Sequence, residues 1–374
     1  MKNTNKRDDL QGLRCVAICG VLAFHLRPDI FKNGWVGVDA FFVLSGYLMA
    51  TILGREISKA SESGASFTSV LANFYIRRFK RIVPLYIVVP LVFFTNDIWH
   101  FTVDLRWAQF FLSNMQSIIN KADYWSQVFS SPVLLHAWSL GVEIQFYLIS
   151  PFIFLLNHNL SSSSRRMGYL VALSIGSLLV QSLSSPTIAF GAMPCRMWQF
   201  LTGALCHELH NSALLDHNPN IPLNKISNIG TAILLFISFA PWKVPETMAK
   251  ITGTLFTGQL VLTGCWVQNG LLSSRISVYI GDLSYILYLV HWPLIVLTKY
   301  HYDLKELDVY LSLKCVLASF AIAIIMHHTL EKYLMTATTG ICVIVVTCLY
   351  ILTISADGSG LINTLSDIAH PSKR

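Results

Sequence analysis

Apolar stretches long enough to cross a bilayer recur along the whole chain. A hydrocarbon core about 30 Å thick needs roughly 20 apolar residues of α-helix. The chain is 53% hydrophobic and only 13% charged, far from the charged surface of a soluble domain of this length. We therefore predict an all-α membrane protein, a polytopic bundle of about 10–11 transmembrane helices. The expected spans are 10–28, 35–53, 81–97, 135–157, 168–186, 192–209, 227–242, 250–268, 276–298, 311–330 and 338–356, and the aromatic-rich segment 98–120 is a further candidate.

Lysine and arginine cluster in the loops on one side of this expected bundle. Lys2, Lys6 and Arg7 precede the first span, a basic group lies between residues 55 and 81, and Arg165 and Arg166 follow the fourth span. Because short cytoplasmic loops are enriched in these residues, we predict a cytoplasmic N-terminus. The net charge of +7 thus reflects membrane topology, and no nucleic-acid partner is expected.

The cysteines and histidines give no metal pattern. Most of the eight cysteines lie inside apolar spans without the paired spacing of disulfides or zinc sites, and are interpreted as small core residues. His327 and His328 are followed too closely by Glu331 for a metal site. We predict no metal.

Two ionisable residues lie within the first expected span. Arg14 and His25 are eleven residues apart, which in an α-helix is about three turns and about 16 Å of rise, so they share one face. Ionisable groups in a membrane normally face a bundle interior or a wet cavity. A topology anchor for Arg14 and an interfacial position for His25 are the plainer alternatives.

Glu143 lies in the apolar stretch "HAWSLGVEIQFYLISP", seven residues after His136. If this span enters from the outer side, Glu143 lies at a depth comparable with His25. A carboxylate that orients an imidazole makes a general base near neutral pH. The alternative is a buried carboxylate paired for packing specificity.

Arg77, Arg78 and Arg81 crowd the expected cytoplasmic entrance of the third span, in "YIRRFKRIVPLY". They could fix topology, contact anionic lipid or form an anion cradle, since arginine holds phosphate oxygens bidentately. Asp39 and Ser45 are expected to shape the same cavity as His25, with a helix N-cap as the alternative for Asp39. His291, two residues before a proline, marks either a kinked helix that faces the cavity or an interfacial belt.

Seven segments together resemble the acyltransferase 3 family, over roughly residues 8–335. They are "LQGLRCVAICGVLAFH", "GVDAFFVLSGYLMA", "RRFKRIVPLY", "HAWSLGVEIQFYLISP", "CRMWQFLTGALC", "GDLSYILYLVHWPL" and "TLEKYLM". The resemblance implies transfer of an acyl group, usually acetyl, from cytoplasmic acetyl-CoA to a hydroxyl of a carbohydrate or lipid-linked glycan. Bacterial O-antigen and exopolysaccharide acetylases are such proteins, which implies the bacterial inner membrane, with membrane lipid around the bundle.

The family's motifs assign expected roles. Its Arg-then-ten-residues-then-His signature falls on Arg14 and His25, and its Arg-x-x-Arg pair on Arg78 and Arg81. On this basis His25, oriented by Glu143, removes the proton of the acceptor hydroxyl, and an acyl-His25 relay is the variant. The expected catalytic residues are His25, Glu143 and Arg14; the donor is expected at Arg14, Arg77, Arg78 and Arg81, and the substrate at Asp39, Ser45, His136, Trp138, Tyr147 and Arg196.

The expected domain organisation is an acyltransferase-like transmembrane domain over 1–335, followed over 336–374 by an additional helix and a short extracytoplasmic tail. Some family members continue into an extracytoplasmic hydrolase-like domain, so a partner domain or protein is expected to assist transfer. Two other classes stay open. A proton-coupled transporter of an anionic solute would show inverted repeats, which are not found, and a non-catalytic relative would have lost His25 or Glu143, which are both present.

Overall fold

The computed structural model describes residues 7–93, 105–120, 132–212 and 222–356, and the expected tail lies outside them. Within the described residues the regular structure is helical and contains no strand, which confirms the all-α prediction. The helices are α1 (Asp8–Leu26), α2 (Val36–Ser63), α3 (Phe67–Val92), α5 (Ser113–Ile119), α7 (Ala137–His158), α8 (Ser163–Leu183), α9 (Pro186–Gly191), α10 (Met193–Asn211), α11 (Leu223–Phe239), α12 (Glu246–Thr263), α13 (Arg275–His301), α14 (Val309–Met326), the π-helix η2 (His327–Glu331), α15 (Lys332–Thr336) and α16 (Thr339–Ala356).

Each of the predicted spans overlaps a described helix. In the part of the chain that the structure describes, six helical segments are long and apolar enough to cross a membrane: α1, α2, α7, α8, α13 and the continuous stretch Val309–Thr336. Two further apolar helices, Leu223–Phe239 and Thr339–Leu352, are shorter. These helices, together with the comparisons below, support a multi-pass membrane protein.

The third predicted span differs most from the structure. Helix α3 begins at Phe67, well before the expected start near residue 81, because the polar sequence before the apolar stretch continues the same helix. Arg77, Arg78 and Arg81 therefore lie within α3 rather than at its entrance. The described part of 98–120 contains the short helix α5, and 98–104 lies outside the described residues.

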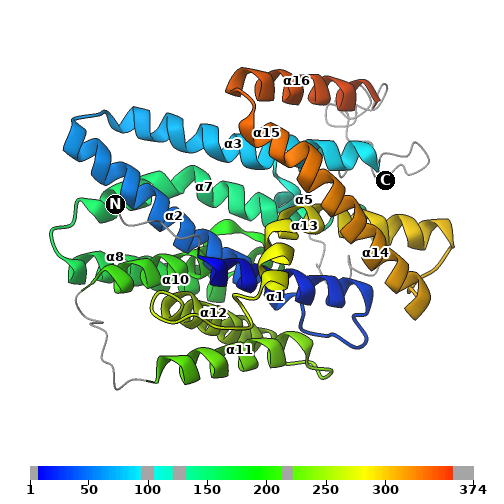
Figure 1. The fold of residues 1–374 in the computed structure, drawn as a ribbon, viewed down its shortest axis with the longest axis horizontal. Coiled ribbons are helices and arrows are strands. Elements are labelled where there is room, and N and C mark those ends of the chain that lie inside the picture. The colour runs from blue at the N-terminus through cyan, green and yellow to red at the C-terminus, as the bar shows by residue number, and fades with distance from the viewer. Residues whose placement is uncertain (1–6, 94–104, 121–131, 213–221, 357–374) are drawn as a thin grey trace.

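Helices α1, α2, α7 and α13 form the centre of the bundle. α1 packs on α13 and α2, and α2 also contacts α7, α10 and α12. Figure 1 shows α11 and α12 at one side of this centre, and α3 with α16 at the other. α8 is buried over only 11% of its most apolar window, so most of its apolar side chains are left to contact lipid.

Close approach of α2 and α10 depends on two glycines. A Cβ added to Gly46 would lie 1.8 Å from the Phe200 carbonyl oxygen, and one added to Gly203 would lie 2.0 Å from the Val43 carbonyl oxygen. Both distances are shorter than any side chain tolerates, so the two backbones pack directly against each other. Small residues at such contacts are typical of helix packing in membranes.

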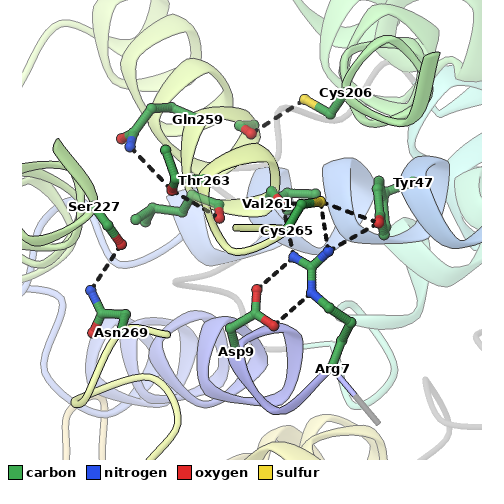
Figure 2. A network of polar contacts seen from close by, with 12 residues as sticks. Arg7, Asp9, Tyr47, Cys206, Ser227, Gln259, Val261, Thr263, Cys265 and Asn269 are labelled. Carbon is green, nitrogen blue, oxygen red and sulfur yellow. Dashed lines mark hydrogen bonds and ion pairs between the residues drawn. The ribbon is translucent and has the colours of Figure 1, made fainter. Parts of the chain in front are cut away.

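A polar clamp ties the start of α1 to α2 and α12. Figure 2 shows the Arg7 guanidinium at its centre: it donates to both carboxylate oxygens of Asp9 at 2.7 and 2.6 Å, to the Val261 carbonyl oxygen at 2.8 Å and to the Tyr47 hydroxyl at 3.0 Å. The Sγ of Cys265 lies 2.9 Å from the same guanidinium. This clamp fixes the end of α1 from which Arg14 projects into the core.

Candidate functional site

A column of polar side chains runs between the four central helices, through a core that is otherwise apolar. Arg14 stands near one end of it and His25 at the other, as expected from their positions on one face of α1.

Three arginines surround one carboxylate at the Arg14 end of the column. Arg14 attracts Glu143 electrostatically and is repelled by Arg78 and Arg81. Glu143 accepts hydrogen bonds from Ser45 and Tyr147. Among the described residues, no hydrogen-bond partner is found for the buried Nε atoms of Arg14 and Arg78. Positive charge therefore exceeds negative charge here, and two N–H groups remain to be satisfied, which suits an anionic ligand.

A small cavity continues the column from this cluster. Its volume is about 50 Å³, enough for one or two water molecules. The walls come from α1, α2, α7 and α13, and the lining residues are Arg14, Val38, Phe41, Phe42, Ser45, Ser139, Leu140, Glu143, Ser284, Tyr285 and Tyr288.

Tyr288 bridges the cavity to the histidines. Its hydroxyl lies 2.5 Å from the Ser139 hydroxyl and donates to the His136 carbonyl oxygen at 2.8 Å. Its ring centroid is 5.7 Å from those of both His136 and His291. Sequence reasoning missed Tyr288 and Ser139. The available signal was their spacing, since each lies within one turn of a suspected residue on the same helix.

His25 and His291 form a hydrogen-bonded pair at the far end of the column. The His25 Nδ1 is 2.9 Å from the His291 Nε2, and the two rings are inclined by 20°. Trp292 lies beside His25, with ring centroids 4.7 Å apart. His291 is 1% exposed and His25 5% exposed. His291 therefore faces the site. This is the first of the two alternatives given for it, and the interfacial belt is the other.

An exposed ion pair lies just beyond the His25 end of α1. Arg27 donates two hydrogen bonds to Asp29, at 2.9 and 2.7 Å. These bonds lower the pKa of the Asp29 carboxyl, so the carboxylate stays anionic as the pH falls toward its usual pKa. The pair is exposed and contributes little stability.

The structure does not bring Glu143 to His25, which differs from the expected pairing. Helix α7 begins just after His136, whose ring lies 5.8 Å from that of His291. Glu143 is seven residues farther along, about 10 Å deeper, beside Arg14. The depth prediction failed because His25 lies one residue before the end of α1, whereas Glu143 is the seventh residue of α7. Among the described residues, the His25 Nδ1 contacts the His291 Nε2 instead.

Arg77 does not join the arginine cluster. Its guanidinium lies 3.4 Å from the Glu56 carboxylate, and its side chain is 57% exposed. Arg77 and Arg78 are adjacent on α3 and project about 100° apart around the helix. Arg78 therefore joins the arginine cluster, and Arg77 does not.

Asp39 and Arg196 form a buried ion pair rather than lining the small cavity. The Arg196 guanidinium lies 3.2 Å from the Asp39 Oδ1, and both side chains are 1% exposed. Arg196 also donates to the Phe190 carbonyl oxygen at 2.8 Å and lies 5.5 Å from the Trp138 ring centroid. The pair joins the first turn of α2 to α10. The two residues are 157 positions apart in the sequence, which explains why the sequence analysis singled out each residue but not the pair.

A larger cavity of about 500 Å³ lies next to this pair. Aromatic, amide and charged side chains line it together, in contrast to the apolar outer faces of the helices. The lining residues include Asn114, Trp138, Gln181, Phe190, Trp198, Glu246 and Lys250. Among the described residues, no three His, Cys, Asp or Glu side chains converge as a metal site requires.

Comparisons with known proteins give one consistent result. A family model described as an acyltransferase domain matches residues 7–355, which includes α16. The chain is 28% identical over 345 residues to the O-acetyltransferase OatA of Staphylococcus aureus (strain NCTC 8325 / PS 47), covering 86% of this chain and 56% of that protein. It is also 28% identical over 326 residues to the putative O-acetyltransferase SACOL0978 of Staphylococcus aureus (strain COL), covering 80% and 52%. The chain thus spans about half the length of the curated relatives it matches. No solved structure matches.

Proposed function

Because the chain belongs to the acyltransferase 3 family, we propose that it is a membrane O-acyltransferase that moves an acetyl group from acetyl-CoA to a hydroxyl of a cell-surface carbohydrate, such as lipopolysaccharide O-antigen or exopolysaccharide. The observation that carries this proposal is the column itself. An arginine cluster with surplus positive charge is joined by a polar cavity to a buried histidine pair.

In this proposal the donor enters from the arginine end. Arg14, Arg78 and Arg81 hold its phosphates, and the unpartnered Nε atoms of Arg14 and Arg78 supply donors for phosphate oxygens. The pantetheine arm then lies along the column, whose length is of the order of the 16 Å rise between Arg14 and His25. Since the cavity measures about 50 Å³, side chains such as Tyr288 must move to admit the arm.

At the far end His25 acts as the general base. As the acceptor oxygen attacks the thioester carbonyl, His25 takes the hydroxyl proton. The new C–O bond forms, the C–S bond breaks, and the departing thiolate receives the proton from the imidazolium. In the alternative, a His25 nitrogen attacks first and passes the acyl group on to the hydroxyl. Glu143 does not orient His25 in either route; it balances the charge of the arginines.

The acceptor belongs on the side where His25 lies. The 500 Å³ cavity offers Trp138 and Trp198 for stacking and Gln181 for hydrogen bonding, which are the kinds of groups that hold polar ligands in concave sites. We place the protein in the bacterial inner membrane. The distribution of Lys and Arg indicates that its N-terminus is cytoplasmic. Because the matched region is only about half of each named relative, a partner extracytoplasmic domain or protein can take part in delivery to the acceptor.

The proposal predicts that Arg78→Gln and Arg81→Gln each raise the KM for acetyl-CoA. Each removes a charged donor from the phosphate site, and a hydrogen bond to a charged group contributes roughly 1.5–3 kcal/mol, or about 10- to 100-fold. The measurement is transfer of labelled acetyl to an alkali-labile glycan ester in membranes that contain the protein, with host glycan extract as acceptor.

Arg77→Gln is the matched control in the same assay. Its guanidinium faces Glu56 outside the cluster, so its KM should stay near that of the wild type. Equal effects of all three substitutions would contradict the donor site described here. Absence of label with folded wild-type protein would overturn the acyltransferase proposal, and solute flux would then be measured.

A further inference from the structure

The hydrogen bonds of the histidine pair indicate which nitrogen of each ring carries a proton. An imidazole has two nitrogens, and in its neutral form one carries a proton while the other presents a lone pair. Which nitrogen of His25 is basic decides where a hydroxyl must lie to lose its proton. The contacts of His291 answer this question, and the inference rests on the role of His25 in the proposed function.

The protonation of His291 follows from its backbone contact. Its Nδ1 lies 2.9 Å from the Leu287 carbonyl oxygen. A carbonyl oxygen can only accept, so Nδ1 carries the proton. Burial of both rings favours uncharged imidazoles, because an isolated charge is costly away from water. The Nε2 of His291 is therefore an acceptor.

The protonation of His25 follows in turn. Its Nδ1 is 2.9 Å from the His291 Nε2, and an acceptor on one ring requires a donor on the other. His25 Nδ1 thus carries the proton, and its Nε2 presents the lone pair. We propose that His291 is a positioning residue that fixes the tautomer of His25, so that Nε2 is the nitrogen that removes the hydroxyl proton.

Helix α13 is built to hold His291 in this orientation. Pro293 has no N–H, so the Leu289 carbonyl lacks its usual donor four residues on. His136, from the start of α7, lies close enough to the Leu289 backbone at this point to interact with it electrostatically. The neighbouring Trp292 donates from Nε1 to the Pro132 carbonyl oxygen at 2.7 Å. Two side-chain contacts therefore tie this turn of α13 to the segment that begins α7.

The same geometry supports the imidazolium that forms during transfer. When Nε2 takes the proton, the Nδ1–H of His25 continues to donate to His291, and the ring need not turn. Backbone Leu287 polarises His291 through its Nδ1–H, which strengthens the acceptor. The carboxylate that fills this place in many catalytic triads is replaced here by a neutral imidazole anchored to a carbonyl.

The test compares His291→Gln with His291→Phe in the acetyl-transfer assay. A glutamine can donate from its amide nitrogen to the Leu287 carbonyl while its oxygen accepts from His25 Nδ1, so it should retain much of the kcat. Phenylalanine fills the space but accepts no hydrogen bond. We expect His291→Phe to lower kcat by about 10²- to 10⁴-fold, with the KM for acetyl-CoA unchanged. His301→Gln and His301→Phe, at an exposed position of the same helix, are the matched controls.

A second readout does not depend on activity. Solid-state ¹⁵N NMR of histidine-labelled protein in lipid, with His25 assigned through the His25→Gln variant, reports which of its nitrogens is protonated. We expect protonated Nδ1 in the wild type and in His291→Gln, and a mixture of tautomers in His291→Phe. Protonated Nε2 in the wild type would overturn the inference, as would full kcat in His291→Phe. Absence of transfer in every form, with the expected tautomer, would instead count against the acyltransferase proposal alone.

Discussion

Replacing His25 by alanine should reduce acetyl transfer several hundred-fold or more, while acetyl-CoA still binds. A positioned general base typically contributes 10²- to 10⁴-fold, and this imidazole lies about 16 Å from the arginine cluster along α1, too far to take part in phosphate binding. The measurement is kcat for labelled acetyl transfer, with donor affinity determined separately by equilibrium binding to purified protein in detergent.

A conservative substitution separates chemistry from packing at this position. His25→Gln keeps a donor toward His291 but provides no basic nitrogen, so it should be as inactive as alanine while unfolding at the wild-type temperature. Near-normal turnover in either variant would exclude His25 as the base. If transfer proceeds through acyl-His25, rapid denaturation near neutral pH in the absence of acceptor should find label on the wild-type chain and none on the variants.

The second large effect is expected at the ion pair between Asp39 and Arg196. Arg196→Met leaves the Asp39 carboxylate in a site that is 1% exposed, where its Oδ2 already lacks a hydrogen-bond partner among the described residues. Breaking a buried pair from one side typically costs about 3–5 kcal/mol. We expect a loss of this size in the free energy of unfolding, measured by denaturant titration in mixed micelles.

The double variant Asp39→Leu with Arg196→Met completes this cycle. It removes both charges from the same apolar surroundings, so it should be clearly more stable than Arg196→Met alone. Arg27→Met disrupts an exposed pair of the same kind and should leave stability nearly unchanged. A double variant less stable than Arg196→Met alone would show that the two side chains do not act as a pair.

The sequence was most informative where the relevant geometry is local. Helical periodicity alone placed Arg14 and His25 on one face of α1, and the structure finds both in the polar column. The helix over 137–158 was likewise predicted nearly to its ends. Rotation and rise within one helix are fixed by backbone geometry, so such inferences need no knowledge of the tertiary structure.

Relations between helices were the part that sequence could not supply. Glu143 was assigned to His25 because the depth of α7 was guessed from topology, and a difference of two helical turns assigns it to Arg14 instead. The hydrogen bond between His25 and His291 joins residues 266 positions apart. Asp39 and Arg196 lie 157 positions apart. The packing of whole helices determines which of these residues meet, and this packing cannot be predicted from the local pattern of a single sequence.

The narrowness of the cavity between Arg14 and Tyr288 has a consequence for the cell's energy supply. A continuous file of water beside titratable side chains would let protons cross the bilayer and dissipate the proton-motive force. Phe41 and Phe42 line that space, whose volume is about 50 Å³, so we expect the column to hold no continuous file of water. Phe41→Ala in sealed vesicles should accelerate the decay of an imposed pH gradient, followed with a pH-sensitive dye, and an unchanged decay would show that the barrier lies elsewhere. We therefore expect the aromatic side chains in this site to limit proton leakage across the membrane.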